Sequence, residues 1–241
     1  MADFIVIDEI KDYIDKRINS LNTNIIDQTD AIIKYMQGGV KEFTSDGIFT
    51  VPAYVKKIRV DAVGGGAGGG AGGGRYELND YSYGSASGGG GGAGEYVTNK
   101  ILNVTPNSSI VVSLGKGGSG GTYVLNQTTL HAANGTNGTS TTVNGITIAR
   151  GGIGGQGGDG TCTRDGSNAA EVGKPGSNYG TGMTAGNENG IGGTGGFSGY
   201  GSYGRGGNGG NAGIRNGNAS EGYSGKDGSD GWVRISWDMG M

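Results

Sequence analysis

The stretches GGIGGQGGDG (151–160) and GGTGGFSGYGSY (192–203) repeat with a period of three residues. A left-handed threefold helix has three residues per turn and rises about 3.1 Å per residue. If two of every three positions carry no side chain, such helices can lie flank to flank and bond to one another through their backbones. Proline would remove donors, and none of the three prolines lies in either stretch. The repeat therefore predicts an array of polyglycine-II-type helices.

Glycine supplies 59 of the 241 residues, and this content sets the energetic problem of the fold. Each glycine costs roughly 0.5–1 kcal/mol more to order than alanine, which amounts to tens of kcal/mol over the chain. Hydrophobic residues are only 33% of the sequence, so side-chain burial cannot offset that cost. We expect dense hydrogen bonding between glycine helices around a modest β core; the alternative is a disordered chain.

The first 37 residues contain no glycine, and their apolar side chains recur at spacings of three and four. This is the seam of a coiled coil with stutters, and isoleucine at most seam positions favours three or more strands. Gln28 is a polar seam residue that would fix register and strand number, and Gly38-Gly39 ends the helix. We expect a trimeric coiled-coil stalk over 1–39; the alternative is an amphipathic helix folded onto the rest of the chain. The trimerisation positions are Ile7, Ile10, Ile14, Ile18, Leu21, Ile25, Gln28, Ile32 and Met36.

The rest of the chain, 40–241, reads as a mainly β head. Alternating apolar residues predict a hairpin around Asp46-Gly47, further strands, and a last strand at 232–237. We expect a β-sandwich head whose connections are drawn out into the glycine array. The other expected strands are 55–63, 96–104, 110–114 and, more weakly, 123–130 and 141–149.

Composition also limits the classes of function. The net charge is −3, with no basic stripe for nucleic acid. No run of 18 apolar residues could span a membrane. The first residues, MADFIVIDEIKDY, lack the charged start and apolar run of a signal peptide, so we expect none. The single cysteine, Cys162, excludes an intrachain disulfide.

No constellation of catalytic or metal-binding residues stands out. The stretch GGSGG (117–121) fits a hydrolase pattern that this composition produces by chance, and the only histidine, His131, lacks a triad context. For DGSDG (227–231) we expect a tight turn before the last strand rather than a cation site. We therefore expect no enzyme activity, no cofactor and no metal.

Four stretches of the head match a known pattern: FTSDGIFTVPAYVKKIRVDAVGGGAGGG (43–70), GGGGGAGEYVTNKILNVTPNSSIVVSLGKGG (88–118), ITIARGGIGGQGGDG (146–160) and DGSDGWVRISW (227–237). Through them the head resembles the glycine-rich domain of bacteriophage tail-fibre and receptor-binding proteins, including the adhesin tips of T-even-type phages. The resemblance implies a sandwich of stacked polyglycine helices whose far-end loops contact the host receptor. The N-terminal stalk departs from those adhesins, which cap a fibre made by another gene.

Four polar or aromatic stretches interrupt the glycine, and loops on a rigid scaffold are where binding residues concentrate. The first is rich in tyrosine, which gives rigid, half-polar contact area. The third places Phe197, Tyr200 and Tyr203 on one edge of one helix, about 9 Å apart, either to stack sugar rings or to be buried on the β core. Candidate receptor-binding residues come from the other three stretches: Arg75, Tyr76, Glu77, Tyr81, Tyr83; Arg164, Asp165, Asn168, Lys174, Asn178, Tyr179, Asn187; Arg215, Asn216.

From the sequence and the resemblance together, we expect a homotrimeric virion fibre protein of the tail or the head. It would be made in the host cytoplasm and attach by its stalk to another virion protein. Its tip would bind a host surface glycan or surface protein. The alternative is a structural or decoration fibre, or a baseplate component, without its own receptor. An ice-binding polyglycine protein fits poorly, because the charged loops and β strands leave no flat, regular face.

Overall fold

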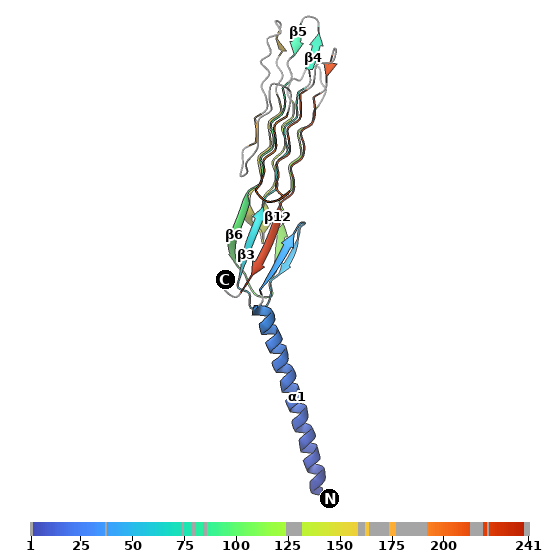
Figure 1. Ribbon diagram of the computed structural model, residues 1–241, viewed down its shortest axis with the longest axis vertical. Helices are drawn as coiled ribbons and strands as arrows, with labels where there is room; N and C mark the ends of the chain where they lie inside the picture. Colours follow the sequence, from blue (N-terminus) through green and yellow to red (C-terminus); the bar gives the residue numbers. More distant parts are fainter. Residues whose placement is uncertain are drawn as a thin grey trace.

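The computed structural model describes the molecule as an elongated particle with three successive parts (Figure 1). A single helix, α1 (Ala2–Met36), stands at one end, β-sheets follow, and extended glycine-rich segments run from the sheets to the opposite end. The chain is therefore mainly β with one N-terminal helix. The described residues are 2–36, 38–73, 75–78, 81–83, 86–123, 132–158, 162–163, 174–176, 192–212, 219–220 and 222–238.

Helix α1 extends away from the sheets, so the alternative of a helix folded onto the head is not found (Figure 1). Its glycine-free sequence ends at Gly38, whose φ of 63° is the left-handed conformation that commonly terminates helices. The seam side chains at six described positions are 48–60% exposed, which leaves an apolar stripe uncovered in the single chain. These are Ile10, Ile14, Ile18, Leu21, Ile25 and Ile32.

Two antiparallel four-stranded sheets form the β part of the molecule that follows α1. The first has the order β1-β12-β3-β6 and the second the order β2-β7-β8-β9. The strands of the first sheet are β1 (Gly39–Phe43), β12 (Trp232–Trp237), β3 (Lys57–Val63) and β6 (Tyr96–Asn103). Those of the second are β2 (Gly47–Thr50), β7 (Ser109–Ser113), β8 (Thr141–Val143) and β9 (Ile146–Ala149).

Both sheets contribute to one apolar core, because alternate residues of each strand point inward. From the first sheet come Ile58, Val60 and Ile235, all fully buried, and from the second Val112 and Val143. The core explains why strands with only three to eight residues are stable beside so much glycine.

Two expectations for the strands are corrected. β1 and β2 do not form a hairpin: β1 pairs with β12 and β2 with β7, so the chain crosses between sheets at Asp46-Gly47. The Asp46 carboxylate fixes this corner by accepting the Leu114 N–H at 2.8 Å. The strand expected at 141–149 is itself a hairpin, since Asn144 and Gly145 both have positive φ, as a tight two-residue turn requires. The strand expected at 123–130 lies almost wholly outside the described residues.

The glycine-rich segments are ordered by hydrogen bonds to one another. Segment 64–73 donates its N–H groups to three segments, at 86–95, 133–139 and 223–229. Its carbonyls accept from three different segments, and all of these bonds measure 2.8–3.0 Å. We call the hydrogen-bonded set the glycine array; its described segments are 64–73, 86–95, 115–123, 132–140, 151–158, 174–176, 192–196, 204–212 and 222–231.

Side chains close much of the outer surface of the glycine array. Pairs of Asn or Asp three residues apart accept glycine N–H groups of the adjacent segment at 2.7–2.9 Å. The tight turn expected at DGSDG (227–231) is therefore wrong: the segment is extended, and its two aspartates are caps of this kind. The pairs are Asn134 and Asn137, Asn208 and Asn211, and Asp227 and Asp230.

Candidate functional site

A small third sheet lies at the end of the glycine array farthest from α1 (Figure 1). Its order is β10-β5-β4-β11, and all its pairings are antiparallel. We call it the distal sheet. Its strands are β4 (Arg75–Leu78), β5 (Tyr81–Tyr83), β10 (Cys162–Thr163) and β11 (Ala219–Ser220).

The distal sheet joins three of the four stretches that interrupt the glycine repeat. β4 and β5 come from the first stretch, β10 opens the second, and β11 belongs to the fourth. In the register, Cys162 faces Tyr83 and Ala219 faces Tyr76. Segments about 80 and 140 residues apart in the sequence thus meet at one end of the molecule.

Five sequence-predicted site residues, Arg75, Tyr76, Glu77, Tyr81 and Tyr83, lie in the paired strands β4 and β5. They were expected in a loop and are found in strands, where the pairing with β10 and β11 holds their backbones. Eight others lie outside the described residues: Arg164, Asp165, Asn168, Asn178, Tyr179, Asn187, Arg215 and Asn216.

Lys174 is placed on the flank of the glycine array and not in the distal sheet. Its carbonyl accepts the Gln156 N–H at 3.0 Å, and two residues later Gly176 donates to the Gly90 carbonyl at 2.9 Å. The second interruption therefore includes a segment that hydrogen-bonds along the array.

The third interruption lies at the opposite end of the array, on the outer face of the first sheet. The Tyr200 ring stacks on buried Trp232 with centroids 4.2 Å apart, and the Tyr203 ring lies 6.4 Å from that of Tyr200. The predicted edge with 9 Å spacing is wrong, because the backbone turns here, with positive φ at Gly199, Gly201 and Gly204.

The same turn places one aromatic ring against the outer face of the first sheet and leaves another exposed to solvent. Burial, and after it the negative charge of Glu42, raises the pKa of the Tyr200 phenol above its ordinary value of 10.0. Phe197 remains 38% exposed, with the guanidinium of Arg205 4.9 Å from its ring centroid. Tyr200 thus covers the sheet, whereas Phe197 is accessible.

A polar cavity of about 630 Å³ opens where the glycine array meets the second sheet. Sequence reasoning singled out none of its residues, which come from three stretches of the chain: 95, 137–140 and 147–153. Its polar side chains are Glu95, Asn137, Ser140, Thr147 and Arg150. In the sequence, asparagine stands at 134 and 137, but serine stands at 140. This break in the three-residue spacing is the signal that could have indicated the cavity.

Among the described residues, His, Cys, Asp and Glu side chains do not gather in groups of three or more that could hold a metal ion. Within the same residues, no helix combines the length and apolar character needed to cross a membrane.

Comparison with known proteins identifies the family to which the head belongs. No curated protein matches the chain. A family model described as "Glycine-rich domain" matches residues 43–238, from the end of β1 through β12 and including the glycine array and the distal sheet. This match covers most of the sequence, so the chain belongs to the glycine-rich domain family.

Proposed function

We propose that this protein is a homotrimeric virion fibre protein, of the tail or the head, that binds the host cell surface through its distal sheet. The observation that carries the proposal is the distal sheet itself. It gathers three separate polar stretches, with Arg75, Tyr76 and Glu77 in β4, at the end of the molecule opposite α1. A recognition surface at the far end of a stiff support is what an attachment fibre requires.

The proposed support is a sandwich head with a bundle of polyglycine-II helices. The bonding of segment 64–73 favours that geometry, because every third residue donates to the same neighbour. Gly65, Gly68 and Ala71 donate to residues 139, 136 and 133 of one segment. Recurrence every third residue is what three residues per turn produces. Six neighbours around one segment would make the support stiff.

The proposed stalk is a trimeric coiled coil of α1. Its exposed seam would be buried between three copies, and full burial of each isoleucine or leucine contributes roughly 1.5–3 kcal/mol. Gln28 would sit in the seam as the polar residue that fixes register. The stalk would dock on another virion protein. Three identical tips would then raise apparent affinity for a host glycan or surface protein without any new contact.

The test of the stalk uses the full chain with Ile18→Glu and Ile25→Glu together. We expect analytical ultracentrifugation to find a trimer for the wild type and a monomer for the variant, with unchanged β-sheet circular dichroism. The control is Ser20→Glu, on the opposite side of α1, which should remain trimeric. A wild-type monomer, or a trimeric double variant, would contradict the stalk.

The test of the tip uses particles that carry Tyr76→Ala, Tyr81→Ala and Tyr83→Ala together. We expect slower adsorption to host cells while the amount of fibre on each particle stays constant. Unchanged adsorption would remove the distal sheet from the receptor site. If particles without the protein also adsorbed normally, the alternative of a structural or decoration fibre would replace our proposal.

A further inference from the structure

Asparagine side chains cap one edge of the glycine array in a regular ladder. Asn134 accepts the Gly157 N–H at 2.8 Å, and Asn137 accepts the Gly154 N–H at 2.9 Å. Each step moves three residues along both segments in opposite directions. The next step would join residue 140 to the N–H of residue 151.

Residue 140 is a serine, and its side chain is too short to continue the ladder. Its hydroxyl oxygen is one bond from Cβ, whereas the amide oxygen of asparagine is two bonds away. Among the described residues, no hydrogen bond joins Ser140 to Gly151. Both residues line the polar cavity of about 630 Å³. The cavity therefore opens beside the Gly151 N–H that a third asparagine would cap.

The mouth of the cavity has a fixed backbone. Glu95 donates its N–H to the Arg150 carbonyl at 2.8 Å, and its carboxylate accepts the Arg150 N–H at 2.9 Å. These two residues bring one negative and one positive side chain to the same opening. The site consequently has little net charge.

The remaining walls combine hydroxyl, amide and apolar groups. Ser140, Thr147 and Asn137 can each donate and accept hydrogen bonds. Ile153, which is 48% exposed, provides an apolar surface. A volume of this size lies within the usual range for small-molecule sites, in which a few polar groups orient the ligand.

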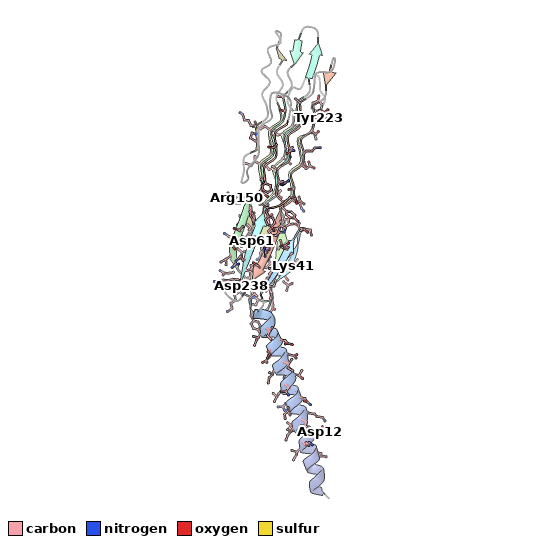
Figure 2. The ribbon with its side chains drawn as sticks, viewed as in Figure 1. Asp12, Lys41, Asp61, Arg150, Tyr223 and Asp238 are labelled. Atoms are coloured by element: carbon pink, nitrogen blue, oxygen red, sulfur yellow. The ribbon has the colours of Figure 1, made fainter. Side chains whose placement is uncertain are left out.

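The geometry points to a binding site for a neutral saccharide of one or two rings. A sugar presents hydroxyls that donate and accept, which matches the mixed walls, and an apolar ring face that can rest on Ile153. Its hydroxyl oxygen would accept the Gly151 N–H in place of the absent asparagine. Figure 2 shows Arg150 where the sheets meet the glycine array, far from the distal sheet, so this lateral site is independent of the proposed tip.

The test is saturation-transfer difference NMR on the full chain with glucose, galactose, N-acetylglucosamine, maltose and lactose, each at millimolar concentration. We expect a signal from at least one of these sugars with the wild type and its loss with Ser140→Asn, whose amide oxygen would complete the ladder by occupying the Gly151 N–H and would project into the cavity. Ser140→Asn should fold with an unchanged or higher Tm. That result would separate loss of the site from loss of the fold.

The matched control is Asn134→Ser, which shortens a cap two steps from Ser140 and outside the lining of the cavity. It should lower Tm but keep the sugar signal, as should the triple tyrosine variant of the distal sheet. The proposal is overturned if no sugar gives a signal with the wild type. It is equally overturned if the signal survives Ser140→Asn or disappears only in the distal-sheet variant. The first two of these results do not bear on adsorption through the tip, whereas the third would place sugar binding in the distal sheet.

Discussion

A methyl group on Gly69 would overlap the carbonyl of Asn208 in the neighbouring segment of the glycine array, well inside the closest approach of real Cβ atoms. For Gly69→Ala, the segment has to move aside by about an ångström. Gly69 is buried, donates its N–H to the Lys226 carbonyl at 3.0 Å and accepts the Gly121 N–H at 2.8 Å. Each buried group left without a partner costs about 1–3 kcal/mol.

Loss of both hydrogen bonds therefore costs about 2–6 kcal/mol. Alanine also lowers the conformational entropy of the unfolded chain relative to glycine, which stabilises the folded protein by about 0.4–1 kcal/mol. We expect a net destabilisation of about 2–5 kcal/mol, large against the 5–15 kcal/mol typical of a folded protein. At about 2–4 °C per kcal/mol, the Tm should fall by roughly 10 °C.

Gly73→Ala is the matched control in the same segment. Its new methyl group would lie 3.4 Å from the Gly158 carbonyl oxygen, an ordinary van der Waals contact. This variant should be neutral or slightly more stable in urea and thermal unfolding followed by circular dichroism. Equal Tm values for the two variants, unchanged or raised relative to the wild type, would refute the close packing of the array, because in a loose coil both substitutions would be neutral or stabilising.

Three further predictions concern single side chains. The Thr141 hydroxyl accepts the Gly115 N–H at 2.8 Å and donates to the Val63 carbonyl at 2.6 Å. Thr141→Val should therefore lower the free energy of unfolding, measured by urea denaturation, by about 1–3 kcal/mol for each buried group it leaves unpaired. Thr141→Ser keeps the hydroxyl and should be close to the wild type in the same assay. Asp227→Ala removes one cap of the array and should cost about 0.5–1.5 kcal/mol, whereas Asp227→Asn keeps the acceptor and should be tolerated in the same assay. Because the pKa of Tyr200 is raised in the folded protein, its contribution to stability is complete below pH 10.0 and is lost as pH rises through the folded value. The Tm of Tyr200→Phe should therefore fall less than the Tm of the wild type between pH 9 and pH 11. An identical fall of Tm with pH in both proteins would contradict the raised pKa.

The N-terminal helix and several strands could be predicted because their signals are local. A glycine-free stretch with apolar spacings of three and four specifies a helix whatever its partners, and β12 alternates cleanly. The choice of partner strand is not local. Phe43 and Ile48 flank a turn signal, yet they enter different sheets because the Asp46 corner and the core decide the pairing.

The glycine repeat itself could not distinguish an extended segment from a turn. Around Tyr200 the period of three continues, but Gly199 and Gly201 take positive φ and reverse the chain. The distal sheet was also beyond sequence reasoning, since a two-residue strand such as Cys162–Thr163 has no periodicity to read. The regular spacing of Asn134 and Asn137 was visible, but only the structure shows that it caps an edge.

The bonding cycle of segment 64–73 restricts how this gene can change in length. Each N–H faces one of three neighbours in strict rotation. Insertion of one codon would turn every later donor by about a third of a circle toward the wrong neighbour. Insertion of three codons would restore the rotation but would outgrow the adjoining segments unless they lengthened too. Natural insertions and deletions should therefore be tolerated in the connections between segments of the array and selected against within the segments themselves.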